Sequence, residues 1–111
     1  MKNWNHIKSE SDFYDILEKS KEYPQIIFKD SVSCGISAFA KERLEGGNEA
    51  MTAKATFNYL DLLAYRSISS LIAKELDVVH HSPQIIVLKN GKVVYTTTHH
   101  SIQPEKIADK L

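Results

Sequence analysis

Two runs of strand-forming residues, 84–89 and 92–97, stand on either side of the dipeptide Asn90-Gly91. A two-residue turn with positive φ at both positions matches the twist of paired strands, and Asn-Gly adopts it readily. The sequence therefore predicts an antiparallel hairpin over 84–97. The last third of the chain must then contribute to a β-sheet, which excludes an all-helical fold.

Before the hairpin, short apolar runs alternate with segments whose apolar residues recur at helical spacing. Strands are predicted over 25–29, as a central strand buried on both faces, and over 56–61. A short strand around 4–7 would add a fifth. Helices are predicted to about residue 22 from a cap near Ser9, from Cys34 to a stop at Gly46-Gly47, to about 77 from a cap at Ser67, and to 111 from a cap at Ser101. The apolar stripe of the second helix is Ile36, Phe39, Ala40 and Leu44. This order predicts an α/β fold, a mixed sheet of four to five strands with helices on both faces.

Length and charge limit the possible functions. The chain has 111 residues, 42% of them hydrophobic, which predicts a single domain over 1–111. Lys plus Arg and Asp plus Glu number 14 each, so no nucleic-acid or anionic membrane partner is expected. The longest apolar runs, 62–65 and 85–88, are far shorter than the ~20 residues that span a bilayer. The N-terminal residues lack a signal-peptide pattern, and a cytoplasmic location is expected.

The only cysteine, Cys34, excludes an internal disulfide. It follows a short polar loop and opens a predicted helix, where amide N–H groups and the helix dipole favour a thiolate. The motif Ser33-Cys34-Gly35-Ile36-Ser37 adds a glycine that permits close approach of a partner's backbone. Ser37 lies one turn later, and its hydroxyl can donate either to the thiolate or to the backbone. Because serine cannot accept a disulfide, resolution requires a thiol from outside the chain. The alternative is a buried, inert cysteine.

A second feature is Ser82-Pro83, which stands immediately before the strand predicted over 84–89. Only X–Pro bonds adopt the cis form at low cost, and a cis bond here would present the main chain of Ser82 to an extended substrate. The alternative is an ordinary trans proline at the start of a strand.

These motifs resemble the thioredoxin superfamily and, within it, the monothiol bacilliredoxin family of the bacillithiol system. The resemblance rests on residues 33–37, 59–66 and 81–84, which lead to 89–92, and it covers nearly the whole chain. It implies a three-layer thioredoxin-like fold, with Cys34 as the nucleophile and Pro83 as the cis-proline. Ordinary thioredoxins have tryptophan, proline and a second cysteine at three positions of this motif. This chain has Ser33, Ile36 and Ser37 at those positions.

The resemblance also implies an activity, which is removal of bacillithiol from protein mixed disulfides. Bacillithiol would be a co-substrate, no cofactor or metal would be bound, and the partners would be bacillithiolated client proteins and a low-molecular-weight thiol. A monomer is expected. Cys34 and Ser37 are the candidate catalytic residues. Candidate substrate contacts are Ser33, Gly35, Ile36, Ser82 and Pro83. Candidate cations for the carboxylates of bacillithiol are Lys29, Lys41, His80 and His81, although each can instead be a solvated surface group.

Two other functions fit parts of the pattern. Residues 34–37 also resemble the C-G-F-S motif of glutaredoxin-related iron–sulfur carriers, but the Gly-Gly-x-Asp-like segment of that group is replaced by Thr and His over 96–100. Alternatively, the chain is a catalytically silent thioredoxin-fold interaction module. The pairs 80–81 and 99–100 are adjacent histidines, whose side chains point in opposite directions in extended structure, so no metal site is expected.

Overall fold

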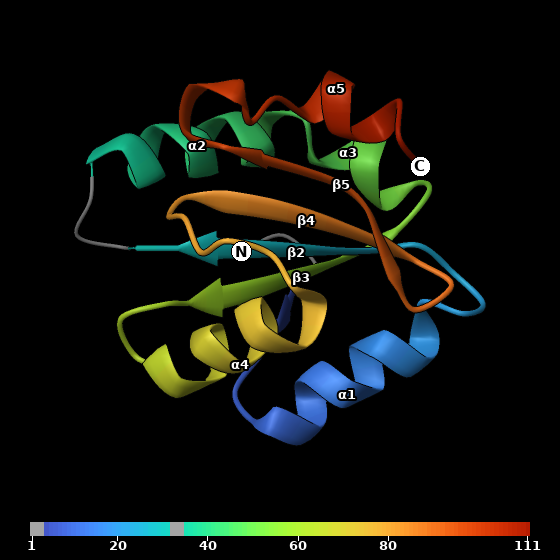
Figure 1. Cartoon of the computed structure of the whole chain (residues 1–111). Helices are drawn as coiled ribbons and strands as arrows, with labels where there is room; N and C mark the ends of the chain where they lie inside the picture. Colours follow the sequence, from blue (N-terminus) through green and yellow to red (C-terminus); the bar gives the residue numbers. More distant parts are fainter. Residues whose placement is uncertain (1–3, 32–34) are drawn as a thin grey trace.

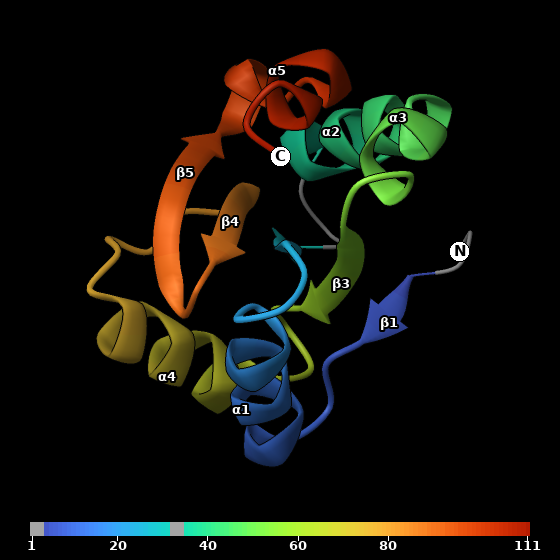
Figure 2. The same cartoon turned by 90° about the vertical axis from the view of Figure 1, so that its right-hand side faces the viewer.

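A five-stranded sheet in the order β1-β3-β2-β4-β5 forms the middle layer of the protein. The computed structural model describes residues 4–31 and 35–111. In chain order the elements are β1 (Asn5–His6), α1 (Glu10–Lys19), β2 (Gln25–Asp30), α2 (Gly35–Gly46), α3 (Asn48–Thr52), β3 (Thr56–Asp61), α4 (Arg66–Leu76), β4 (Gln84–Lys89), β5 (Lys92–Thr98), the 3-10 turn η1 (His99–Ser101) and α5 (Pro104–Ala108). Helices α2, α3 and α5 cover one face and α1 and α4 the other (Figure 1, Figure 2), which confirms the α/β class.

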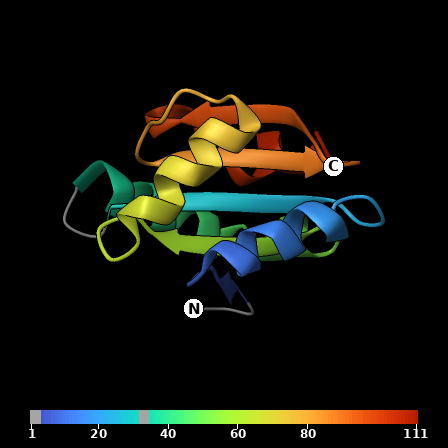
Figure 3. The ribbon, with the colours of Figure 1, turned by 60° about the horizontal axis from the view of Figure 1, so that its bottom comes forward.

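The sheet is mixed because β2 runs parallel to β3 and antiparallel to β4. Every residue of β2 is buried, as expected for a central strand. Alternation sends Ile26 and Phe28 into the core under α2 and α5, and Ile27 into the core under α1 and α4. Figure 3 shows α1 and α4 lying across this second face. No helix in the described ranges combines the length and hydropathy needed to cross a bilayer.

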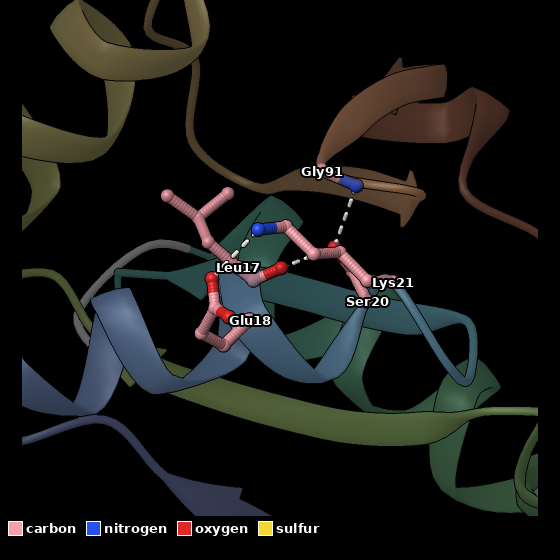
Figure 4. A network of polar contacts seen from close by, with 5 residues as sticks. All are labelled: Leu17, Glu18, Ser20, Lys21 and Gly91. Carbon is pink, nitrogen blue, oxygen red and sulfur yellow. Dashed lines mark hydrogen bonds and ion pairs between the residues drawn. The ribbon is translucent and has the colours of Figure 1, made fainter.

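The hairpin forms as predicted, with φ of 55° at Asn90 and 75° at Gly91. Its turn is tied to the end of α1 (Figure 4). The N–H of Asn90 donates to the Ser20 carbonyl at 2.7 Å, and the N–H of Gly91 donates to Ser20 Oγ at 2.9 Å. The Ser20 hydroxyl in turn donates to the Leu17 carbonyl at 2.6 Å. One buried serine therefore joins the first helix to the turn of the hairpin.

Several helix boundaries differ from the sequence-based expectations. Helix α1 ends at Lys19 rather than near residue 22. Helix α4 begins at Arg66 with Tyr65 as its N-cap, so Ser67 lies within the first turn and does not cap it. Ser101 belongs to the turn η1, and α5 starts only at Pro104. Neither helix start is capped by a serine side chain: the N-cap residues are Tyr65 and Gln103, and α5 has a proline at its first position.

The segment after α2 was also predicted incompletely. Helix α2 ends at Gly46 as expected, but the five-residue helix α3 follows at once. Within α2, Ala40 and Leu44 are buried, whereas Phe39 is 63% exposed. Residues 40 and 44 are four apart and share one face of the helix, and Phe39 lies to the side of that stripe. The expectation that Phe39 belongs to the core is wrong.

Candidate functional site

The C-terminal ends of β2 and β3 and the start of β4 meet at one edge of the sheet. Asp30 is paired with Asp61 across the parallel strands, and Lys29 with Gln84 across the antiparallel pair. The N–H of Leu62 donates to the Asp30 carbonyl at 2.9 Å, which holds the β3–α4 loop against the end of β2. Helix α2 starts at this same edge (Figure 1). The ends of β2 and β3 and the starts of α2 and β4 therefore lie at one edge although they are distant along the chain.

The position of the predicted nucleophile, Cys34, is known only from the residues that precede and follow it in the chain. Ser33 and Cys34 lie outside the described residues, and the side chains of Ile36 and Ser37 do so too. Helix α2 begins at Gly35, the residue that follows Cys34. The roles of Cys34 and Ser37, and the substrate contacts of Ser33, Gly35 and Ile36, stay predictions.

The loop before β4 contains the second predicted feature. The Ser82–Pro83 peptide bond is cis. Pro83 is buried, and its carbonyl accepts a hydrogen bond from the N–H of His99 at 3.2 Å. The hydroxyl oxygen of Ser82 is buried without a hydrogen-bond partner among the described residues. A buried polar group without a partner costs about 1–3 kcal/mol. A molecule bound at this edge that accepts a hydrogen bond from the Ser82 hydroxyl would remove that cost.

Lys29 is fully buried at the end of β2, on the α4 side of the sheet. Its Nζ donates to the Ser69 carbonyl at 3.0 Å and lies 3.3 Å from Nδ1 of His80. The same His80 nitrogen is 3.4 Å from Oγ of Ser69. Burial lowers the pKa of Lys29 to about 8. The pKa of His80 is also lowered, by burial and by the charges of Lys29 and His81. The interpretation of Lys29 as a solvated surface charge is wrong.

The lowered pKa of Lys29 predicts how stability changes in mild alkali. Between pH 8 and 10.5 the unfolded chain keeps the proton that the folded protein has released. The free energy of unfolding then rises with pH through this window, by up to about 3 kcal/mol. The raised pKa of Tyr59 acts in the opposite sense above about pH 10, where unfolded tyrosine ionises.

Urea unfolding at several pH values between 7 and 10 measures this rise. The variant Lys29→Met should lack it, whereas Lys92→Met, which changes an exposed lysine at the hairpin turn, should keep it. Identical pH profiles for wild type and Lys29→Met would show that Lys29 titrates as a solvated lysine.

The opposite face of β2 carries a buried carboxylate. The Tyr59 hydroxyl donates to Oδ2 of Asp30, and the two residues are 4% and 1% exposed. Burial and the hydrogen bond to Asp30 raise the pKa of Tyr59, and the charges of Asp30, Asp61 and Glu45 add to this effect. Nζ of Lys41 lies 5.3 Å from the centre of the Tyr59 ring. This pair was not predicted from the sequence. The strand was predicted to end at residue 29, with Asp30 in the loop that follows, whereas β2 extends to Asp30 and buries it.

Two other histidines, His81 and His99, contact each other. The rings of His81 and His99 lie 5.9 Å apart, edge to face, and join the loop before β4 to η1. The two histidines of the pair 80–81 thus have different surroundings, since His80 meets Lys29. Across residues 4–31 and 35–111, no three His, Cys, Asp or Glu side chains are grouped as metal ligands would be.

A family model described as monothiol bacilliredoxin BrxC matches residues 5–107. The chain belongs to this family. It is therefore a thiol–disulfide oxidoreductase with one cysteine in its whole sequence. The match confirms the resemblance drawn from residues 33–37, 59–66 and 81–84.

Solved structures agree with this assignment. A protein described as a candidate oxidoreductase with a thioredoxin fold is similar at 26% identity and a TM-score of 0.85, over 97% of this chain and 93% of that one. Spinach chloroplast thioredoxin f is 20% identical, with a TM-score of 0.74 and coverage of 97% and 86%. Thioredoxin from Malassezia sympodialis is 20% identical, with a TM-score of 0.73 and coverage of 96% and 85%. The last two support the thioredoxin fold alone.

Proposed function

We propose that this bacilliredoxin removes bacillithiol from protein mixed disulfides by two thiol exchanges at Cys34. In the first, the Cys34 thiolate attacks the bacillithiol sulfur, a new S–S bond forms between Cys34 and bacillithiol, and the bond to the client sulfur breaks. The client leaves as a thiolate and takes up a proton from water. No net oxidation occurs, because one disulfide replaces another.

The second exchange regenerates the enzyme. A thiolate from another low-molecular-weight thiol attacks the bacillithiol sulfur of the mixed disulfide and releases Cys34 as a thiolate. The product is a small-molecule disulfide. An outside thiol is required because Ser37 stands at the position of a resolving cysteine. The reaction needs no bound metal or nicotinamide, and we place it in the cytoplasm, with residues 1–111 acting as one monomeric domain.

The observation that carries the proposal is the position of the single cysteine in a chain of this family. Cys34 is the residue before the first residue of α2, and α2 starts at the edge of the sheet where β2 ends. The first N–H groups of α2 have no partner within the helix and favour a thiolate at that point. In this scheme Ser37 donates to the sulfur, and the Ser82 hydroxyl, with Pro83, contacts the bound disulfide. Ser33, Gly35 and Ile36 form the opposite wall. The family match favours this exchange over an iron–sulfur carrier or a silent interaction module.

Intact mass spectrometry tests the choice of small thiol. Wild-type protein is incubated separately with oxidised bacillithiol and oxidised glutathione, and Cys34→Ser serves as the control. We expect the bacillithiol adduct on wild type to form at least about tenfold faster than the glutathione adduct, and no adduct on the variant. Equal labelling by both disulfides, or faster labelling by glutathione, would reject bacillithiol as the preferred thiol.

A further inference from the structure

A groove of about 710 Å³ runs between α4 and the β3–α4 loop. Leu62 and Leu63 form its loop side, and Arg66, Ser70 and Lys74 face it from α4. His80 closes it next to the Ser82-Pro83 loop. Its volume falls within the range of about 300–1,000 Å³ that is usual for small-molecule sites.

The groove is positively charged. Arg66 and Lys74 are exposed and both line the groove; eight residues apart on a helix, they lie about 12 Å apart along its axis and about 80° apart around it. Long flexible side chains at this spacing can converge on a ligand that lies over Ser70. The described residues that line the groove include no Asp or Glu. The nearby Asp61 carboxylate is directed into its own loop, where Oδ1 accepts the N–H groups of Leu63 and Ala64 at 3.2 and 3.3 Å.

A buried cation lies directly beneath this surface. The Lys29 ammonium is 3.0 Å from the Ser69 carbonyl and 3.3 Å from Nδ1 of His80, and both of those residues line the groove. Its field is screened less by water than that of a surface lysine, so it adds to the positive potential inside the groove.

The groove also lies beside the edge of the sheet where β2 ends and β4 begins. Leu62 donates its N–H to the carbonyl of Asp30, the last residue of β2. His80 is two residues before Ser82, whose hydroxyl has no partner among the described residues. A small ligand can therefore place one end in the groove and its sulfur at the edge of the sheet.

We propose that this groove binds the carboxylate end of the low-molecular-weight thiol, with Arg66 and Lys74 pairing with its two carboxylates. The proposal rests on the exchange chemistry above and names the residues that select an anionic thiol. Arg66 supplies paired N–H donors for one carboxylate, Lys74 neutralises the other, and the Ser70 hydroxyl donates between them. The leucines contact the apolar faces of the sugar that joins the carboxylates to the cysteinyl group. A small molecule suits this site better than a client segment because the groove is limited to one helix face and one loop.

The test compares disulfides that share the chemical step at Cys34. Rates of adduct formation are measured with oxidised bacillithiol and with bis(2-hydroxyethyl) disulfide, which is neutral and has no group for the groove. The proteins are wild type, Arg66→Gln, Lys74→Gln, the double variant and the charge-matched control Lys92→Gln. We expect the double variant to react at least about tenfold more slowly with oxidised bacillithiol and within twofold of wild type with the neutral disulfide. The control should match wild type with both.

The outcomes separate this inference from the proposed function. If wild type does not prefer oxidised bacillithiol to oxidised glutathione, the proposed choice of thiol fails and the groove inference fails with it. If wild type prefers bacillithiol and the double variant keeps the full rate, only the groove inference is wrong. An equal loss with the neutral disulfide would also overturn it, because the substitutions would then act on Cys34 rather than on a carboxylate.

Discussion

Replacing Cys34 with serine is expected to abolish release of bacillithiol from a client protein, lowering the rate by at least about three orders of magnitude. An alcohol at this position is protonated at neutral pH and is a far weaker nucleophile than a thiolate. The chain has no other cysteine that could take over the reaction. The substitution exchanges sulfur for oxygen in a side chain of nearly the same size, so the fold should be retained.

The measurement is the appearance of free client thiol from a bacillithiolated client, followed by mass spectrometry with a small thiol present. Circular dichroism and thermal unfolding of Cys34→Ser confirm that the variant is folded. A folded variant that keeps more than a tenth of the wild-type rate would show that the chain acts without its own sulfur. Cys34 would then not be the nucleophile, and the proposed exchange would be wrong.

Adding one methyl group at Gly47, between α2 and α3, is expected to cause a large loss of stability. A Cβ built there would lie 2.3 Å from Cβ and 2.5 Å from Cγ of Pro104. Pro104 is buried at the start of α5, and its ring cannot rotate away. The helices must separate to relieve the overlap, so Gly47→Ala should lower the free energy of unfolding by about 3 kcal/mol. The midpoint of thermal unfolding should fall by about 10 °C.

Gly46 provides the matched control, because a Cβ added there meets nothing within 4 Å. Gly46→Ala should leave stability unchanged or raise it by up to about 1 kcal/mol, since alanine favours the helical state. Urea and thermal unfolding of the two variants measure the difference. If both substitutions have the same effect, the contact between Gly47 and Pro104 does not hold α5 in place. A clear loss only for Gly47→Ala would confirm that contact.

The sequence predicted those parts of the fold whose causes are local. The turn at Asn90-Gly91 and the buried run of β2 are each specified by a few consecutive residues. The order of cysteine motif, proline and hairpin then identified the family. Helix starts were less predictable, because a serine caps a helix only if it is the residue directly before the first helical turn. Ser67 lies inside α4, and Ser101 lies in η1, so neither serine is in that position.

The parts that could not be predicted depend on residues brought together by the fold. Lys29 meets His80 across 51 positions, and Tyr59 meets Asp30 across 29. The sequence marked Lys29 and His80 separately as candidate cations but gave no reason to pair them. The requirement for glycine at position 47 likewise depends on Pro104, which arrives from the last helix. The groove of Arg66 and Lys74 could not be predicted, because it forms only where the loop after β3 and the residues before β4 lie beside α4 in the folded chain.

The pH dependence of Cys34 alkylation tests the central claim most directly, which is that the single sulfur is an accessible thiolate at neutral pH. Rates of reaction with iodoacetamide are measured from pH 4 to 10, with a short cysteine-containing peptide as the reference. We expect the Cys34 reaction to titrate well below the free-cysteine value of about 8.5. Titration at or above that value, or no alkylation of the folded protein, would contradict the proposed exchange at Cys34.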